Sequence, residues 1–178
     1  MQEAGCGAGC RGAGWGGVIL ELVRQGSVTT LRDLIMKIAE EDYLYLAAVF
    51  PKEYRGLVDQ FLDPRKPEAK RRDFNKIRNY LFAYLEQADG LECQLKYECC
   101  DESTGFEVDH IFPLSTNVLN KRIRKLPAPE GKKVPAQAIG SNNPLNLILA
   151  CKKCNGHKKH GLIEVEVLKG ILERRFPL

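Results

Sequence analysis

Hydrophobic and polar positions along the first half of the chain follow a helical period. Four apolar residues at spacings of three and four come after a Ser/Thr-rich helix start: Leu31, Leu34, Ile35 and Ile38. Similar patterns predict helices over 43–50, 52–62 and 74–88. Between the last two, the proline-containing and charged segment 63–72 predicts a linker. Residues 27–88 are therefore predicted to form a helical region that this linker interrupts.

After residue 89 the pattern changes to short apolar segments that are typical of strands. Two of them, 91–100 and 105–112, flank the turn-like residues 101–104 and predict a β-hairpin. A connection rich in Pro and Gly follows over 113–143, and so long a segment without elements of its own tends to be functional. In the last segment, 162–178, the first apolar residues could form a strand, but the later spacing favours a C-terminal helix.

Composition changes this picture mainly at the start of the chain. Residues 1–26 are rich in Gly and Ala, which predicts a flexible tail, and they lack the pattern of a secretory signal. The 178 residues are 44% hydrophobic and 28% charged, as expected for one globular domain or a small module with extensions. No apolar run reaches the roughly 18 residues that a membrane span needs. We therefore expect a cytoplasmic protein with no membrane partner.

Charge is concentrated in one part of the chain. The formal net charge is only +4, but the segment 113–160 contains ten Lys and Arg residues and the single acid Glu130, a net charge of +9. Such a concentration is typical of a protein that binds a polyanion, most simply a nucleic acid. A solvated loop without a partner is the alternative.

Cysteine and histidine also gather in the second half. The chain has seven cysteines and no secretory signal, which argues against a disulfide framework and leaves metal binding or burial as their use. Five of them lie beyond residue 90, as do all three histidines: His110, His157 and His160. We therefore expect the chemistry of the chain in this half.

Three polar clusters interrupt the apolar sequence there. Asp109 and His110 stand side by side within FEVDHIFP, where a flat strand would point them to opposite faces. Asn146 begins the step NLILA, which leads directly into CKKCNGHK. A hairpin, a loop and then a short helix that carries the last cluster would together form a ββα unit.

In order and spacing, VDHIFP, NL and CKKCN resemble the motifs of HNH nucleases, the ββα-metal class, over roughly residues 91–161. The resemblance implies an α+β fold, in which the helical region is followed by an HNH module at 89–161 with a long basic loop insertion and then by a C-terminal helix at 162–178. It also implies a metal-dependent DNA endonuclease of the restriction, homing, phage or mobile-element type.

The resemblance assigns a role to each polar cluster. His110 would be the general base that activates water, because an imidazole can accept a proton at neutral pH. Asp109 and Asn155 would hold a divalent metal through oxygen atoms, which suits Mg²⁺ or Mn²⁺. Asn146 would hold the loop by hydrogen bonds that orient His110. The strand is then expected to kink or end at Asp109 and His110.

Many members of the family carry a separate structural zinc on four cysteines. Cys151 and Cys154 match the second pair, and Cys100 matches one member of the first pair. Tyr97 stands where the other member is expected, so that Cys93 or Cys99 would have to substitute in the Zn²⁺ site. The first pair would then be Cys93 with Cys100 or, in an alternative arrangement, Cys93 with Cys99. A group of small buried hydrophobic residues is the other interpretation of these cysteines.

Basic side chains and one histidine are expected to contact DNA phosphates, with RNA not excluded as a substrate. They are Lys121, Arg122, Arg124, Lys125, Lys132, Lys133, His157 and Lys158. A competing hypothesis is a zinc-stabilised nucleic-acid-binding module of the same fold without cleavage. A thiol redox protein is a weaker one, because CKKC lacks the βαβ context of that motif. The sequence leaves open whether the chain acts as a monomer or a homodimer.

Overall fold

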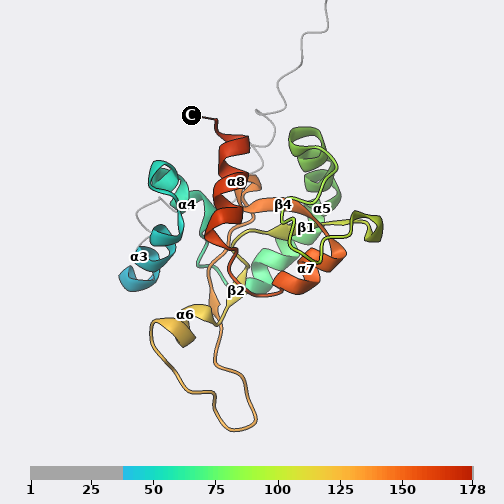
Figure 1. The fold of residues 1–178 in the computed structure, drawn as a ribbon. Coiled ribbons are helices and arrows are strands. Elements are labelled where there is room, and N and C mark those ends of the chain that lie inside the picture. Colours follow the sequence, from blue (N-terminus) through green and yellow to red (C-terminus); the bar gives the residue numbers. More distant parts are fainter. Residues whose placement is uncertain (1–37, 178) are drawn as a thin grey trace, which may run out of the picture.

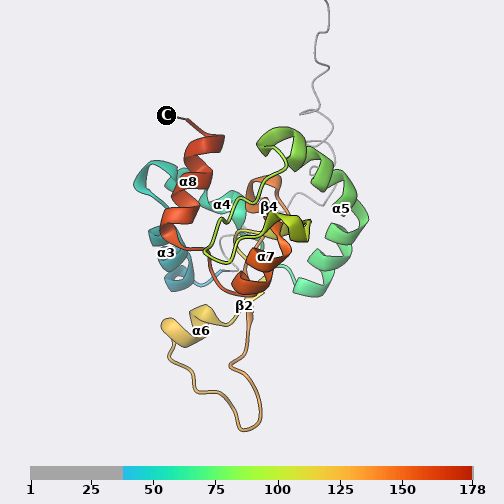
Figure 2. The same cartoon turned by 45° about the vertical axis from the view of Figure 1, so that its right-hand side comes forward.

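In the computed structural model, which describes residues 38–177, helices surround two small antiparallel sheets (Figures 1 and 2). The elements in chain order are α3 (Glu40–Val49), η1 (Lys52–Leu57), α4 (Val58–Phe61), α5 (Pro67–Asp89), η2 (Glu102–Thr104), β1 (Phe106–His110), β2 (Ser115–Thr116), α6 (Val118–Arg122), β3 (Gln137–Ala138), η3 (Pro144–Asn146), β4 (Leu147–Cys151), α7 (Lys152–Lys158) and α8 (Val165–Arg175). This mixture agrees with the predicted α+β class. The predicted tail and the helix near residue 31 lie outside the described residues.

The central sheet consists of β1 and β4, which run antiparallel with Val108 opposite Leu149 and His110 opposite Leu147. All five residues of β4 are buried, because helices and core cover both faces of the strand. One face packs against three residues of α5: Phe74, Leu81 and Leu85. The opposite face of β4, through Ile148 and Ala150, joins the main core. Helix α7 follows β4 directly and contacts both strands (Figure 1).

The prediction that 91–100 and 105–112 form a hairpin was wrong about the strand that pairs with β1. Residues 91–100 contain no strand, and β1 pairs instead with β4, across the intervening residues 111–146. The side chains of Cys93 and Leu95, which alternate with polar neighbours, lie in the main core. Between them, the Gln94 N–H donates a single hydrogen bond to the Leu149 carbonyl at 2.8 Å. The strand-like pattern of 91–100 therefore arises because alternate side chains are buried, and not because the segment pairs with a strand.

Helix α5 begins inside the segment that the sequence predicted to be a linker. Pro67 is its first residue, a position where the fixed φ of proline suits the helix and the missing N–H costs nothing. The helix ends before Gly90, whose φ of 80° closes it in the left-handed region that glycine adopts most readily. Only the first residues of 63–72 are thus outside helical structure.

The helical first half shares its core with the second half. The rings of Phe50 and Phe112 stack with centroids 5.5 Å apart, and Phe61 meets both edge-on at 5.0 and 6.0 Å. Helix α8 adds Leu168 and Ile171 to the same cluster. The residues that precede the proposed module therefore support it directly rather than forming a separate core.

The long connection after β1 contains short elements of its own. β2 and β3 pair antiparallel within it, and α6 lies between them beside a loop that projects from the body (Figure 1). Gly140 returns the chain so close to β1 that a Cβ at this position would lie 1.9 Å from the Phe112 carbonyl oxygen. The connection is thereby fastened next to the end of β1. Among the described residues, no helix is both long and apolar enough to cross a membrane.

Candidate functional site

Strand β1 ends at His110, and its last two side chains point to opposite faces of the sheet. The His110 ring packs against Phe74 of α5, with ring centroids 4.9 Å apart, and only 8% of the residue is exposed. Asp109 points the other way, toward α7, where its carboxylate accepts from Lys158 Nζ at 2.8 Å. The strand end therefore presents an imidazole on the α5 side and a carboxylate on the α7 side.

Asn142, which belongs to none of the motifs found in the sequence, determines which nitrogen of the His110 ring carries the proton. Asn142 Nδ2 donates to the Lys70 carbonyl oxygen at 2.8 Å, and a carbonyl can only accept, so Asn142 Oδ1 must face His110 Nε2 at 2.9 Å. Nε2 of a neutral ring then carries the proton and Nδ1 is the free acceptor. Within the sequence, Asn142 lies in a run of Ser and Asn before a proline, which indicates only a turn.

Burial is the main reason that the pKa of His110 is lowered from its ordinary value, since it penalises the charged ring. The hydrogen bond with Asn142 and the Asp109 carboxylate oppose this shift. The neutral ring, which can accept a proton, is consequently the favoured form at neutral pH.

Asn146 ties the chain that follows His110 to the loop that precedes β4. Its side-chain amide accepts from the Phe112 N–H at 2.8 Å and donates to the carbonyls of Phe112 and Ser141 at 3.0 and 2.8 Å. Its backbone carbonyl accepts from the Ile111 N–H at 2.8 Å. The residue is fully buried, so all these bonds are shielded from water and hold the end of β1 in place.

Three oxygen-bearing side chains gather on the α7 side of the strand end. Glu107 and Asp109 lie two residues apart on β1 and so share a face, and Asn155 Nδ2 of α7 donates to Glu107 Oε2 at 2.7 Å. Glu107 is absent from the site predicted from the sequence, although this alternation could have indicated it. The hydrogen bonds of the described residues join Asn155 to Glu107, and Asp109 to Lys158, rather than Asp109 to Asn155.

Lys158 does not lie where the sequence predicted it. Only 1% of its side chain is exposed, and its ammonium group donates to Asp109 and to the His110 carbonyl, at 2.8 and 2.6 Å. A buried ammonium group needs such partners, because an unpaired charge in the interior would be very costly. Lys158 therefore joins α7 to the end of β1 instead of reaching into solvent.

Four cysteines form a compact cluster at the junction of β4, α7 and the segment 91–100. The Sγ atoms of Cys93, Cys100, Cys151 and Cys154 all lie within 4.8 Å of one another. The Cys100 and Cys151 sulfurs are 3.9 Å apart, close to the roughly 3.8 Å edge of a tetrahedron with Zn–S bonds of about 2.3 Å. The cluster could hold a metal such as zinc. Cys99 is exposed and lies outside it, near the Lys153 carbonyl.

The surroundings of Cys100, Cys151 and Cys154 differ, and among these three only those of Cys151 favour the thiolate form that binds a metal. Burial raises the pKa of Cys100 to about 11 and raises that of Cys154 as well. Burial also acts on Cys151, but hydrogen bonds from the backbone N–H groups of Cys154 and Asp101 outweigh it and lower the pKa to about 7. Such N–H donors stabilise thiolate, the form of cysteine that binds a metal.

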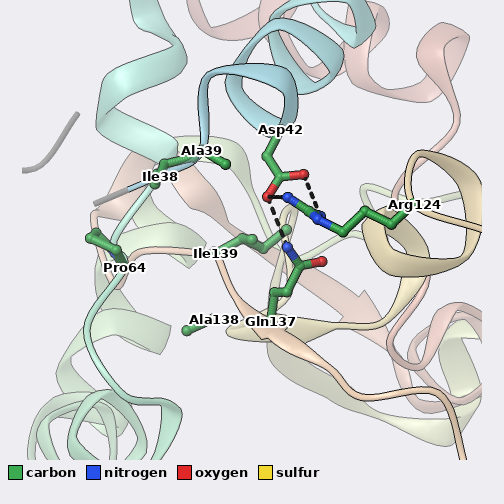
Figure 3. A pocket seen from close by; sticks show the side chains of 8 residues that line it. All are labelled: Ile38, Ala39, Asp42, Pro64, Arg124, Gln137, Ala138 and Ile139. Atoms are coloured by element: carbon green, nitrogen blue, oxygen red, sulfur yellow. Dashed lines mark hydrogen bonds and ion pairs between the residues drawn. The ribbon is translucent and has the colours of Figure 1, made fainter. Parts of the chain in front are cut away.

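The predicted nucleic-acid contacts divide into two groups. Arg124 forms ion pairs with Glu41 and Asp42 of α3, and Arg122 donates to the Tyr45 hydroxyl at 3.0 Å, so both are engaged within the protein. Arg124 and Asp42, with Gln137, border a cavity of about 330 Å³ (Figure 3). The remaining basic side chains of this group are exposed: Lys121 in α6, and Lys125, Lys132 and Lys133 in the projecting loop. His157 is exposed on α7, with its ring 5.3 Å from that of Tyr97.

Lys70 of α5 is a second buried ammonium group beside the site. It is 0% exposed and donates to the carbonyls of Asp63 and Gly140, at 2.5 and 2.7 Å. Burial lowers its pKa to about 8, while the Asp63 carboxylate opposes the shift and Arg65 and Arg71 add to it. The side chain thus anchors α5 to the connection that Gly140 brings against the end of β1.

The lowered pKa of Lys70 predicts that the stability of the fold rises with pH. Above about pH 8 folded Lys70 loses its proton, whereas in the unfolded chain it keeps the proton up to about pH 10.5, so the free energy of unfolding should rise over that interval. The rise should approach about 3 kcal/mol. In Lys70→Met it should disappear, as denaturant unfolding of both proteins at several pH values would reveal. Parallel pH profiles for the two proteins would contradict the prediction.

Comparison of the chain with protein-family models, with curated proteins and with solved structures found no match. Any functional assignment consequently rests on two groups of side chains, the end of β1 with its neighbours on α5 and α7, and the four-cysteine cluster.

Proposed function

We propose that the chain is a metal-dependent DNA endonuclease of the HNH type that hydrolyses phosphodiester bonds. The observation that carries the proposal is the arrangement of the antiparallel pair β1 and β4 with α7 directly after it. In this arrangement Asn155 of α7 lies against Glu107, on the face of β1 that also carries Asp109, and Asn146 holds the chain that follows His110. In the sequence, all of these residues except Glu107 match the motif positions of HNH nucleases, and this match supports the proposal.

His110 acts as general base in this proposal. Its Nε2 is committed to Asn142, so Nδ1 takes the proton of a water molecule whose oxygen attacks the phosphorus atom. The bond from phosphorus to the leaving oxygen then breaks, and that oxygen takes up a proton. Phe74 and Asn142 hold the ring in one orientation, which keeps the acceptor aimed at the substrate.

The oxygen atoms on the α7 side fit a hard divalent cation. Glu107, Asp109 and Asn155 offer carboxylate and amide oxygens, the ligands that Mg²⁺ or Mn²⁺ prefer. A cation held there would neutralise charge on the phosphate and on the leaving oxygen. Glu107 is our addition to the pair expected from the sequence. Lys158, which neutralises Asp109 in the structure, would share that carboxylate with the cation.

The exposed lysines of the projecting loop supply the affinity for the DNA backbone, because phosphate contacts of this kind require charge but no base recognition. The cysteine cluster has a structural role and would hold zinc with four thiolates, a closed ligand set that leaves no position for substrate. The two metals therefore have separate ligands and separate tasks.

The test is nicking of a supercoiled plasmid. We expect conversion to open-circular or linear DNA with Mg²⁺ or Mn²⁺ and none when the divalent cation is omitted. Omission by dialysis is preferable to a chelator, which would also strip the cysteine cluster. If the intact protein fails to nick plasmid both with Mg²⁺ and with Mn²⁺, the enzyme proposal fails.

A second candidate is a zinc-stabilised DNA-binding module that does not cleave. The observation that favours it is the Lys158 ammonium group on Asp109, which occupies one oxygen of the proposed metal site with a positive charge of the protein's own. Tight plasmid binding without nicking under either cation would select this function.

A further inference from the structure

The exposed face of α5 is strongly basic along the half that lies nearest the site. Four cationic side chains are exposed there: Arg71, Arg72, Lys76 and Arg78. Among residues 38–177, none of the four makes an ion pair or a side-chain hydrogen bond with another side chain. The nearby acids are Glu68 and Asp73, and Asp73 is already paired with Arg65. The face therefore carries uncompensated positive charge, which favours a partner with a dense negative charge.

The position of this face relative to His110 follows from the packing of α5. Phe74 contacts the His110 ring, and Arg71 and Arg78 stand three residues before and four residues after it, on the neighbouring stripe of the helix. The Lys70 carbonyl is also joined to His110 through Asn142. His110 points to the face of the sheet that α5 covers, so a phosphate that reaches its ring would lie beside this helix. Figure 2 shows the course of α5 along the molecule.

We infer that Arg71, Arg72, Lys76 and Arg78 of α5 form a second contact surface for the DNA phosphate backbone. Arg71 and Arg78 are its members nearest the base His110, and Arg72 and Lys76 extend it around the outer side of the helix. The inference deepens the proposed function and rests on it for the identity of the partner. Phosphates of one strand would run along the helix, while the projecting loop holds the duplex elsewhere. The exposed amides of Asn75 and Asn79 lie among these cations, so the surface also offers neutral hydrogen-bond donors to the backbone.

Salt dependence of DNA binding tests the surface, because each phosphate contact releases condensed counterions. Each phosphate contact makes the plot of log association constant against log salt concentration steeper by about 0.9. One contact therefore adds a three- to fourfold loss of affinity between about 50 and 200 mM salt. Binding would be measured by anisotropy of a fluorescent duplex without added Mg²⁺ or Mn²⁺, in a His110→Ala background where cleavage is slowed. The variant is R71Q/R72Q/K76Q/R78Q, and its matched control is K52Q/R55Q, which removes two exposed charges on η1.

We expect the quadruple variant to bind more weakly and to have a slope shallower by about 2 to 4, with the control close to the parent protein. Replacing the three arginines with lysine should restore most of the slope, since charge is what matters. An unchanged far-UV spectrum and melting temperature exclude misfolding, and Gln preserves the helix. A slope no shallower than that of the control would overturn the inference.

Failure of this inference can be told apart from failure of the proposed function. If plasmid is nicked but the slope does not respond to the α5 substitutions, the endonuclease stands and the surface does not. If the α5 substitutions make the salt dependence of binding shallower as expected, but the protein nicks plasmid neither with Mg²⁺ nor with Mn²⁺, the contact surface is supported and the enzyme proposal is rejected. Absence of DNA binding by the parent protein overturns both.

Discussion

Replacing Cys154 with serine should lower the free energy of unfolding by about 4 kcal/mol or more in zinc-loaded protein. Cys154 is fully buried, and its sulfur belongs to a cluster whose four atoms lie within 4.8 Å. Three sulfurs cannot complete a closed tetrahedral site, and the binding energy of a structural metal is folding energy. Denaturant unfolding, together with elemental analysis for one zinc per chain, measures both parts of this prediction.

Cys99→Ser is the matched control, because Cys99 is exposed and lies outside the cluster. It should keep its zinc and stay within about 0.5 kcal/mol of the parent protein. A chelator should destabilise the parent and Cys99→Ser but have little further effect on Cys154→Ser. If the chelator leaves the stability of the parent unchanged, the cysteines form an ordinary buried cluster and hold no metal.

Replacing His110 with alanine should reduce plasmid nicking by about 10²- to 10⁴-fold, the usual contribution of a positioned general base. The loss should appear in the rate of cleavage, while the affinity for DNA changes little, because an 8% exposed ring offers little surface for ground-state contacts. Single-turnover cleavage with protein in excess, compared with anisotropy on the same duplex, separates the two quantities.

His160→Ala serves as the control for this experiment. His160 is exposed beyond the end of α7, and its backbone carbonyl, which accepts from Thr116, survives the substitution. Its rate should match that of the parent protein. Equal nicking by His110→Ala and His160→Ala would remove His110 from the mechanism, whatever else cleaves the DNA.

The cysteine cluster was the part of the structure most accessible from the sequence. Metal chemistry restricts the residue types strongly, and the candidate set of Cys93, Cys100, Cys151 and Cys154 is the set that the fold brings together. Spacing alone did not decide between the pair Cys93 and Cys100 and the pair Cys93 and Cys99, because the choice depends on which side chain points inward. The Cys100 sulfur lies in the cluster, whereas Cys99 is exposed and lies outside it.

The sheet was predicted less well because local pattern does not specify the partner of a strand. Residues 91–100 and β4 are both apolar enough to pair with β1, and the nearer one in sequence was the wrong choice. The start of α5 was missed because the charged residues after Pro67 resemble a linker. Except for the buried Lys70, they lie on the solvent-facing side of a helix whose apolar stripe begins at Phe74.

Two residues near the proposed site, Asn142 and Glu107, belong to no sequence motif, and only the tertiary structure brings them there. Asn142 reaches His110 only because the loop before β4 returns beside α5, and Glu107 reaches Asn155 only because α7 lies across β1. Lys158 shows the converse, since the resemblance to HNH nucleases predicted a contact with the substrate backbone but the fold buries this side chain against Asp109. Long-range packing decides these positions, and sequence spacing does not encode it.

The pairing of β1 with β4 has a consequence for how the chain acquires its fold. During synthesis β1 emerges first and has no partner until residues 111–146 and then β4 have followed, so the strand waits with unpaired N–H and C=O groups. Two cysteines of the cluster precede β1, and the other two stand at the end of β4 and in α7. A metal ion captured by all four would close this loop and bring the strands together, so refolding should be fastest when zinc is present from the start.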